Sequence, residues 1–208
     1  MGFAKISGWL VPQLCAGCRG HCPAGPLICG DCLWDLDEAG PVPGDPPEGV
    51  SRIMSVAPHE GIGRDLLAAY KFRGLYGLGE FLAARMADVT PGNQGSPRTV
   101  VPVPPARGRS RLRGYDTAGD LGARLAGHLG WPYDPETMIR IGSGRQRGRG
   151  RSSRIGNPPE IRSTGQPANE ILLVDDVITT GATLSACALT LREAGAGRIE
   201  AVTFTRRV

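Results

Sequence analysis

The chain has 208 residues, of which 40% are hydrophobic and 21% charged, and this predicts one globular domain, or one with a small appendage, rather than a disordered polypeptide. Aromatic residues make up only 5%, so we expect a mostly aliphatic core. No segment approaches the ~20 consecutive apolar residues that a membrane span needs. Residues 1–12 lack the apolar region and cleavage site of a secretory signal. We therefore expect a cytoplasmic protein without membrane insertion.

The basic residues number 24 against 20 acidic residues, giving a net charge of +4. Only two of them are Lys, one being Lys71, and the rest are Arg. A GC-rich genome explains such a bias, although Arg also suits bidentate contact with phosphate. The charge is uneven, because residues 1–60 carry a net −4 and residues 61–208 carry +8. Acidic residues are absent from 89–115 and 137–159, where Arg is densest, so these two windows are candidates for contact with a polyanion.

Five of the six cysteines lie between residues 15 and 32. They include two C-x-x-C pairs, Cys15 with Cys18 and Cys29 with Cys32. In a cytosolic chain two such pairs favour a tetrahedral zinc site over scattered buried cysteines or a redox pair. Four thiolates leave no open coordination position, so the zinc is expected to be structural. Each C-x-x-C pair is called a knuckle. Cys22 does not fit the knuckle spacing, and Cys187 lies in a helical pattern further along the chain, so both are interpreted as bystanders that do not bind the metal.

Domain boundaries are predicted from a segment rich in Pro and Gly. Residues 39–49, AGPVPGDPPEG, read as a linker. The predicted organisation is a zinc-binding module over 1–38, the linker, and a larger domain over 50–208.

The larger domain alternates helical and strand patterns. In chain order we predict helices over 64–72 and 78–89, a strand over 99–103, a helix over 116–129, a strand over 171–174, a helix over 183–194 and a strand over 199–204. Such alternation predicts an α/β fold with a largely parallel sheet flanked by helices.

A hydrophobic strand, two acids and a hydroxyl-rich loop follow one another in ILLVDDVITTGAT, residues 171–183. Asp175 and Asp176 are placed at the carboxyl end of a strand, where α/β folds bind ligands, and carboxylates there accept from ribose hydroxyls or orient Mg²⁺. The loop amides and the following helix N-terminus suit a phosphate. The alternative is an N-cap with a surface acid pair and an ordinary turn. The predicted phosphate-binding residues are Thr179, Thr180, Gly181, Ala182 and Thr183.

The run VDDVITTGAT resembles the phosphoribosyl diphosphate (PRPP) motif of type I phosphoribosyltransferases. With the cysteine pairs it makes nearly the whole chain resemble the ComF family of competence-associated, phosphoribosyltransferase-like proteins. Further shared motifs are YKFRG at 70–74, VPVP at 101–104, RGY at 113–115, and Gln146, Arg154 and Asn157 at family-like spacing. The resemblance implies a type I phosphoribosyltransferase-like fold with a small N-terminal four-cysteine zinc module.

The resemblance also implies roles for particular residues. Asp175 and Asp176 would be the catalytic acids, meeting the ribose hydroxyls and the Mg²⁺ that accompanies PRPP. The diphosphate loop would lie near residues 103–113, and its candidates are Arg107, Arg109, Arg111 and Arg113. A hood over the site would lie at 145–157, and its candidates are Gln146, Arg154 and Asn157. Two departures from the family pattern, Asp116-Thr117 in place of Asn-Gln and Pro158-Pro159-Glu160, fall where substrate contact is expected.

Three functional hypotheses follow. The first is a Mg-dependent PRPP-binding phosphoribosyltransferase, acting on an acceptor that the sequence does not name, in DNA uptake or nucleotide metabolism. The second is a competence factor that binds single-stranded DNA, with proteins of the DNA-uptake machinery as partners. Its Arg clusters suit phosphates, whereas the scarcity of aromatic residues disfavours base stacking. The third is a catalytically silent sensor of PRPP or another ribose phosphate.

Overall fold

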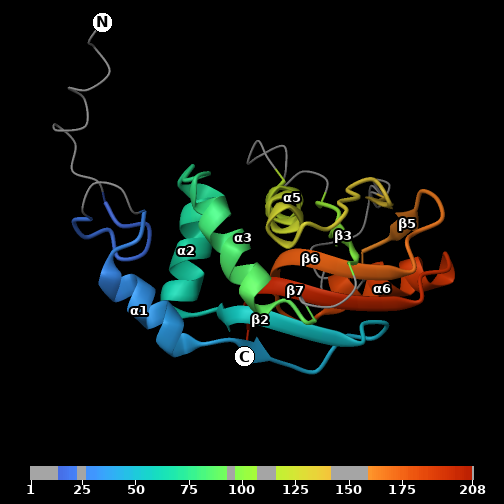
Figure 1. The fold of residues 1–208 in the computed structure, drawn as a ribbon, viewed down its shortest axis with the longest axis horizontal. Coiled ribbons are helices and arrows are strands. Elements are labelled where there is room, and N and C mark those ends of the chain that lie inside the picture. The colour runs from blue at the N-terminus through green and yellow to red at the C-terminus, as the bar shows by residue number, and fades with distance from the viewer. Residues whose placement is uncertain (1–13, 23–26, 93–96, 107–115, 142–158, 208) are drawn as a thin grey trace, which may run out of the picture.

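The structure is a computed structural model that describes residues 14–22, 27–92, 97–106, 116–141 and 159–207. Within these ranges no helix combines the length and the apolar character that crossing a membrane requires. The elements run in chain order as shown in Figure 1: α1 (Gly30–Ala39), β1 (Val42–Pro43), β2 (Arg52–Pro58), α2 (Gly61–Phe72), α3 (Leu78–Val89), β3 (Thr99–Pro102), α5 (Thr117–Leu129), β4 (Met138–Arg140), β5 (Ile161–Ser163), β6 (Glu170–Ile178), α6 (Ala182–Glu193) and β7 (Arg198–Arg206).

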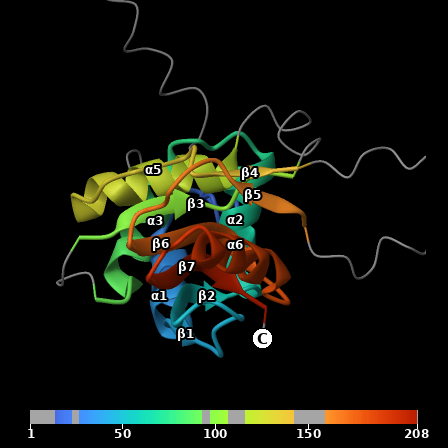
Figure 2. The same ribbon diagram turned by 90° about the vertical axis from the view of Figure 1, so that its right-hand side faces the viewer.

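The main sheet has five strands in the order β1-β2-β7-β6-β3. Strands β2, β7, β6 and β3 run parallel to their neighbours, and only the short edge strand β1 is antiparallel. Strands β4 and β5 form a separate antiparallel pair beside this sheet (Figure 2). The expected α/β fold with a largely parallel sheet is therefore confirmed.

Side chains of β6 alternate between two hydrophobic clusters, one on each face of the sheet. Leu172 and Val174 belong to the cluster that includes α1, α2, α3 and α5. Ile171 and Leu173 belong to the cluster that includes α6. All four are fully buried, as expected for a central parallel strand covered by helices on both faces. Successive residues of β6 therefore face different helices.

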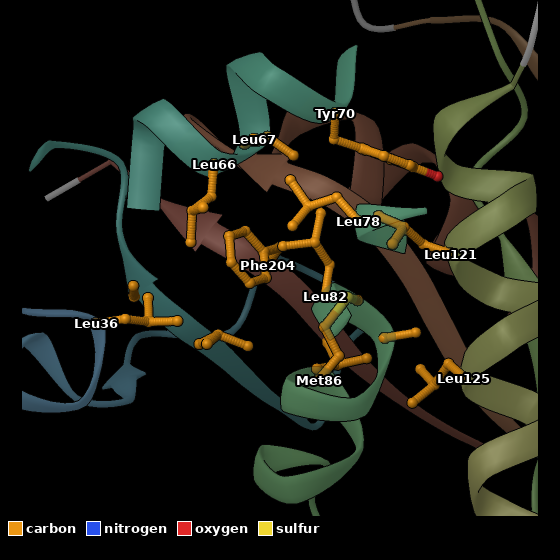
Figure 3. Packing of buried hydrophobic residues seen from close by; sticks show 14 of the residues in the cluster. Leu36, Leu66, Leu67, Tyr70, Leu78, Leu82, Met86, Leu121, Leu125 and Phe204 are labelled. Atoms are coloured by element: carbon orange, nitrogen blue, oxygen red, sulfur yellow. The ribbon is translucent and has the colours of Figure 1, made fainter. Parts of the chain in front are cut away.

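The larger cluster is mostly aliphatic. Phe204 of β7 lies between Leu66 of α2 and Leu82 of α3 (Figure 3). Tyr70 points from α2 towards α5, where its hydroxyl donates to Asp120 Oδ2 at 2.5 Å. Helices α2, α3 and α5 are thus packed together above one face of the sheet. This packing fixes the C-terminal end of α2 relative to α5.

Each predicted helix of the larger domain is present, with small shifts of its ends. The strand expected at 171–174 is longer than predicted, because hydrogen bonding to β7 continues to Ile178. The helix at Gly30–Ala39 was not predicted. Residues 39–49, expected to be a linker, contain β1, and the Gly49 carbonyl oxygen accepts from Arg192 Nε of α6 at 2.7 Å. The division into a cysteine module and a larger domain stays a prediction.

Both outer strands of the main sheet are covered along their edges. The β1 edge is only two residues long and includes Pro43, which has no backbone N–H. On the other side Val100 of β3 donates to the Pro132 carbonyl oxygen at 2.8 Å and accepts from the Asp134 amide at 3.0 Å. Residues 132–134 therefore occupy hydrogen-bonding groups on the outer side of β3.

A buried ion pair lies next to the start of β3. The Arg98 side chain is 5% exposed, and its Nη2 lies 3.2 Å from Oε2 of Glu200, which is 1% exposed. The Arg98 guanidinium carbon also lies 5.2 Å from the ring centre of Trp131. Charges removed from water in this way are stable only while they stay paired.

We predict that Arg98→Met lowers the free energy of unfolding by roughly 3 kcal/mol, because it removes the buried partner of the Glu200 carboxylate and leaves that carboxylate paired with Arg198, whose side chain is 53% exposed. Urea unfolding measures the change. The control is Arg64→Met, since Arg64 is 58% exposed in its pair with Asp65 and surface pairs contribute about 1 kcal/mol or less. Equal losses in the two variants would contradict the prediction.

Candidate functional site

The two adjacent acids lie near the carboxyl end of β6. Because side chains alternate along a strand, Asp176 shares the face of Leu172 and Val174, and Asp175 shares the face of Leu173. The carboxylates therefore have different surroundings, although both line the same cavity.

Asp176 is buried, and both of its carboxylate oxygens are engaged by side chains from the helices above. Lys71 Nζ, at the end of α2, lies 2.7 Å from Oδ1. The Thr117 hydroxyl, at the start of α5, donates to Oδ2 at 2.5 Å. The Asp176 carboxylate is therefore held in one orientation by side chains from two helices.

Asp175 is half-buried and faces the α6 side of the sheet. Its Oδ1 accepts from the Asp176 amide at 2.8 Å. Burial, and then the negative charge of Asp176, raise the pKa of Asp175 to about 8. Because side chains from α2 and α5 engage Asp176 and not Asp175, Asp175 is the carboxyl that a cation or hydroxyl groups entering the cavity would meet.

The hydroxyl-rich loop links the acids to α6. Gly181 has a φ of 75° and precedes the first residue of the helix, and this left-handed conformation favours glycine. A Cβ at this position would also lie 3.0 Å from Pro47 Cγ. The loop lines a small hollow of about 40 Å³. Thr179 and Thr180 are exposed beside the α6 N-terminus, where amides and the helix dipole suit an anion.

A cavity of about 390 Å³ opens at this edge of the sheet. It brings together the two acids, part of the loop, the α5 N-terminus, the segment after β3, and two cationic side chains, Lys71 and Arg140. The lining residues are Lys71, Val103, Pro104, Pro105, Ala106, Asp116, Thr117, Ala118, Arg140, Asp175, Asp176, Val177, Thr179 and Thr183.

Four polar or charged lining residues were absent from the predicted site: Lys71, Asp116, Thr117 and Arg140. Two signals could have indicated Lys71: it is one of only two lysines in the chain, and it lies in the YKFRG motif at 70–74. Asp116 and Thr117 had been noted only as departures from a family pattern. Burial raises the pKa of Asp116, and the nearby charges of Asp176 and Asp120 raise it further, against lowering by the Gly119 and Ala118 amides.

Several predicted site residues lie outside the described part of the chain. They are the diphosphate-loop candidates Arg107, Arg109, Arg111 and Arg113, and the hood candidates Gln146, Arg154 and Asn157. The described residues that precede Arg107, from Val103 to Ala106, line the cavity.

The four predicted cysteine ligands form one cluster. The Sγ atoms of Cys15, Cys18, Cys29 and Cys32 all lie within 4.8 Å of one another, and those of Cys18 and Cys29 are 3.7 Å apart. A tetrahedral site with Zn–S bonds of about 2.3 Å has sulfur–sulfur edges of about 3.8 Å. The cluster therefore fits a structural zinc ion.

Backbone amides support this cluster as well. Gly17 and Cys29 donate to Cys15 Sγ at 3.4 and 3.3 Å, and Gly20 donates to Cys18 Sγ at 3.3 Å. Burial acts to raise the pKa of Cys15, but amide hydrogen bonds led by that of Cys29 outweigh it and bring the pKa to about 6. Cys15 is thus set to act as a thiolate, the form that binds metal.

The cysteine cluster is docked on α2, the helix that carries Lys71. Arg73 Nη2, just after α2, donates to the carbonyl oxygen of Ala16, which lies inside the first knuckle. A Cβ on Gly17 would lie 2.5 Å from Ile62 of α2, so only glycine allows this close approach. Cys22 lies outside the four-sulfur group, and Cys187 is buried on α6, as predicted for bystanders.

No family model and no curated protein matches the chain. Solved structures with a similar fold include purine phosphoribosyltransferase from Pyrococcus horikoshii, with 20% identity, a TM-score of 0.38, and coverage of 62% of this chain and 80% of that one. Hypoxanthine phosphoribosyltransferase from Trypanosoma cruzi shows 19% identity, a TM-score of 0.35, and coverage of 60% and 63%. These likenesses concern the fold alone.

We predict that the purified protein contains about one zinc ion per chain and that Cys15→Ser strongly reduces this content, because the site loses one of its four thiolates and binds the ion more weakly. Mass spectrometry of the metal content measures the ratio. Cys22→Ser changes a buried cysteine of the same module and should keep the metal. Equal metal contents in the two variants would be inconsistent with the four-sulfur assignment.

We also predict that Asp175→Asn stabilises the protein at pH 8 but not at pH 4. A carboxyl whose pKa is raised on folding keeps its proton while the unfolded chain releases it, so wild-type stability falls as pH rises from about 4 to 8. The amide has no proton to lose, and the gain at pH 8 is expected to be about 1 kcal/mol or more. Thermal unfolding at both pH values tests this, with exposed Asp88→Asn as control. A difference from wild type that is the same at both pH values would refute it.

Proposed function

We propose that the protein binds PRPP together with Mg²⁺ and acts as a phosphoribosyltransferase on a second, acceptor substrate. One observation carries this proposal: a carboxylate pair at the end of a central strand and a hydroxyl-rich loop at a helix N-terminus border a single cavity with two cations. A ribose phosphate needs acceptors for its hydroxyls and donors for its phosphate, and this cavity has both.

Each part of the ligand has a matching group. Asp175 lines the cavity, and the hydrogen bond that its carboxylate accepts comes from a backbone amide rather than a side chain, so it suits the ribose hydroxyls. The Thr179–Thr183 loop suits the 5′-phosphate, because it joins hydroxyl donors to the α6 N-terminus. Arg140 suits the diphosphate, since among the described residues no carboxylate pairs with it.

The oxygen donors also fit Mg²⁺, which is bound in proteins through one or two carboxylates and substrate phosphates. Asp175 would hold the ion, while Asp176 is engaged by Lys71 and Thr117. The ion would supply charge neutralisation as diphosphate leaves C1 of the ribose. Arg140 would hold the departing diphosphate by charge-assisted hydrogen bonds.

The family and the process are part of the same proposal. The sequence resemblance supports membership of ComF and a role in DNA uptake, with the uptake machinery as partner. The hypothesis of single-stranded DNA binding depends on the Arg clusters of the acid-free windows, and most of those arginines lie outside the described residues. The sensor hypothesis shares the PRPP site and differs only in turnover, so diphosphate release in the presence of nucleobases and amines separates the two.

Calorimetry with PRPP and Mg²⁺ should show binding by the wild type, and Asp175→Asn should weaken it at least tenfold, because an amide cannot give up a proton to become the carboxylate that binds the ion and the ribose hydroxyls. Arg140→Met should weaken it by roughly tenfold through loss of a charge-assisted contact. The matched control is Arg162→Met, which changes an exposed arginine on the strand that pairs with β4. Wild-type protein that does not bind PRPP would sink the proposed function.

A further inference from the structure

The ion pair between Lys71 and Asp176 is sheltered from water. The Lys71 side chain is 11% exposed and that of Asp176 is 8% exposed, with 2.7 Å between Nζ and Oδ1. Removing one partner of a buried pair of this kind is strongly destabilising, because it leaves the other charge without compensation. Lys71 therefore has a partner within the protein, whereas Arg140, the other cation of the cavity, has no described carboxylate partner.

The end of α2 is fixed on both sides of Lys71. Tyr70 is fully buried and bonded through its hydroxyl to Asp120 of α5. Arg73 Nη2 donates to the Ala16 carbonyl oxygen of the cysteine module, and also to the Asp65 carbonyl oxygen at 3.1 Å. These anchors leave the ammonium group little freedom to leave Asp176.

The orientation of Asp176 matters because its backbone serves the neighbouring acid. Lys71 and Thr117 hold the two oxygens of the Asp176 carboxylate from α2 and α5. The amide of the same residue donates to Asp175 Oδ1 at 2.8 Å. A continuous series of contacts therefore runs from Lys71 through Asp176 to Asp175.

We propose that Lys71 is a positioning residue of the ribose-phosphate site: it holds the Asp176 carboxylate in its orientation, and through the Asp176 amide it sets the Asp175 carboxylate towards the ligand. The inference rests on the proposed function. It assigns Lys71 to the protein's own acid pair and leaves ligand phosphate to Arg140 and the 179–183 loop.

A binding cycle tests whether Lys71 acts through Asp176. The variants are Lys71→Met, Asp176→Asn and the double variant, each titrated with PRPP and Mg²⁺ and with ribose 5-phosphate and Mg²⁺. Lys71→Met is expected to weaken both ligands by a similar factor of roughly ten, yet by less than about twofold when Asp176 is already Asn. A loss confined to PRPP would mean that Lys71 contacts the diphosphate. An equal factor in both backgrounds would mean that Lys71 acts independently of Asp176. Either result would overturn the inference.

A stability cycle without ligand or metal gives an independent readout. Lys71→Met should lower the melting temperature by roughly 6 °C or more, because it strands a buried carboxylate. The double variant removes both charges and should regain part of that loss. Arg64→Met, on the same helix but exposed, should change it little. Additive effects of the two single changes would overturn the pairing.

Lys71→Arg separates charge from packing. Arginine can still donate to Asp176 Oδ1, so this variant should retain wild-type binding to within a few-fold, whereas Lys71→Met does not. Equal binding by the two variants would reduce Lys71 to a space-filling role and overturn the inference. The proposed function is tested separately: it fails if the wild-type protein does not bind PRPP.

Discussion

Strand β6 is hydrogen-bonded to β3 on one side and to β7 on the other, and helices bury both of its faces. Neither its register nor its facing can change without moving apolar side chains out of a cluster. The same alternation that sends Leu172 and Leu173 to opposite faces continues into Asp176 and Asp175. The two acids therefore lie on opposite faces of the sheet and have different partners. One carboxylate belongs to the helical layer above the sheet, and the other remains available to the cavity.

Much of this arrangement could be predicted from the sequence, because it depends on local patterns. The spacing of Leu184, Cys187 and Leu191 predicted α6, and all three are buried. The apolar run before Asp175 predicted β6, although not its length, since the ladder with β7 carries the strand past the acids to Ile178. Helix α1 was missed because it buries only Cys32 and Leu36, too few residues to produce a helical period.

The partners of the acids could not be predicted in this way. Lys71 and Thr117 are separated from Asp176 by long stretches of chain, and they meet it only because α2 and α5 pack over the same face. Nothing in the local pattern of either residue indicates a carboxylate partner. The cysteine cluster was predictable from spacing alone, whereas its contact with α2 through Arg73 was not. Local chemistry was readable from the sequence, but the contacts that join one motif to another depend on the packed fold.

Docking of the cysteine cluster gives it a role beyond its own segment. The Ala16 carbonyl oxygen, inside the first knuckle, accepts a hydrogen bond from Arg73, which lies two residues beyond Lys71. Any metal that stabilises the knuckle also stabilises the end of α2. The cysteine cluster and the cavity are therefore mechanically connected through one helix.

The covered sheet edges also limit how copies of this chain can associate. A two-residue edge strand ending in Pro43 offers few free backbone groups on one side, and residues 132–134 bond to Val100 on the other. Open edges invite strand-to-strand joining between molecules, and short, proline-containing or covered edges prevent it. Self-assembly through a continuous intermolecular sheet is disfavoured by this design. Association of two copies through β1 or β3 is therefore expected to depend on side-chain contacts rather than on backbone hydrogen bonds.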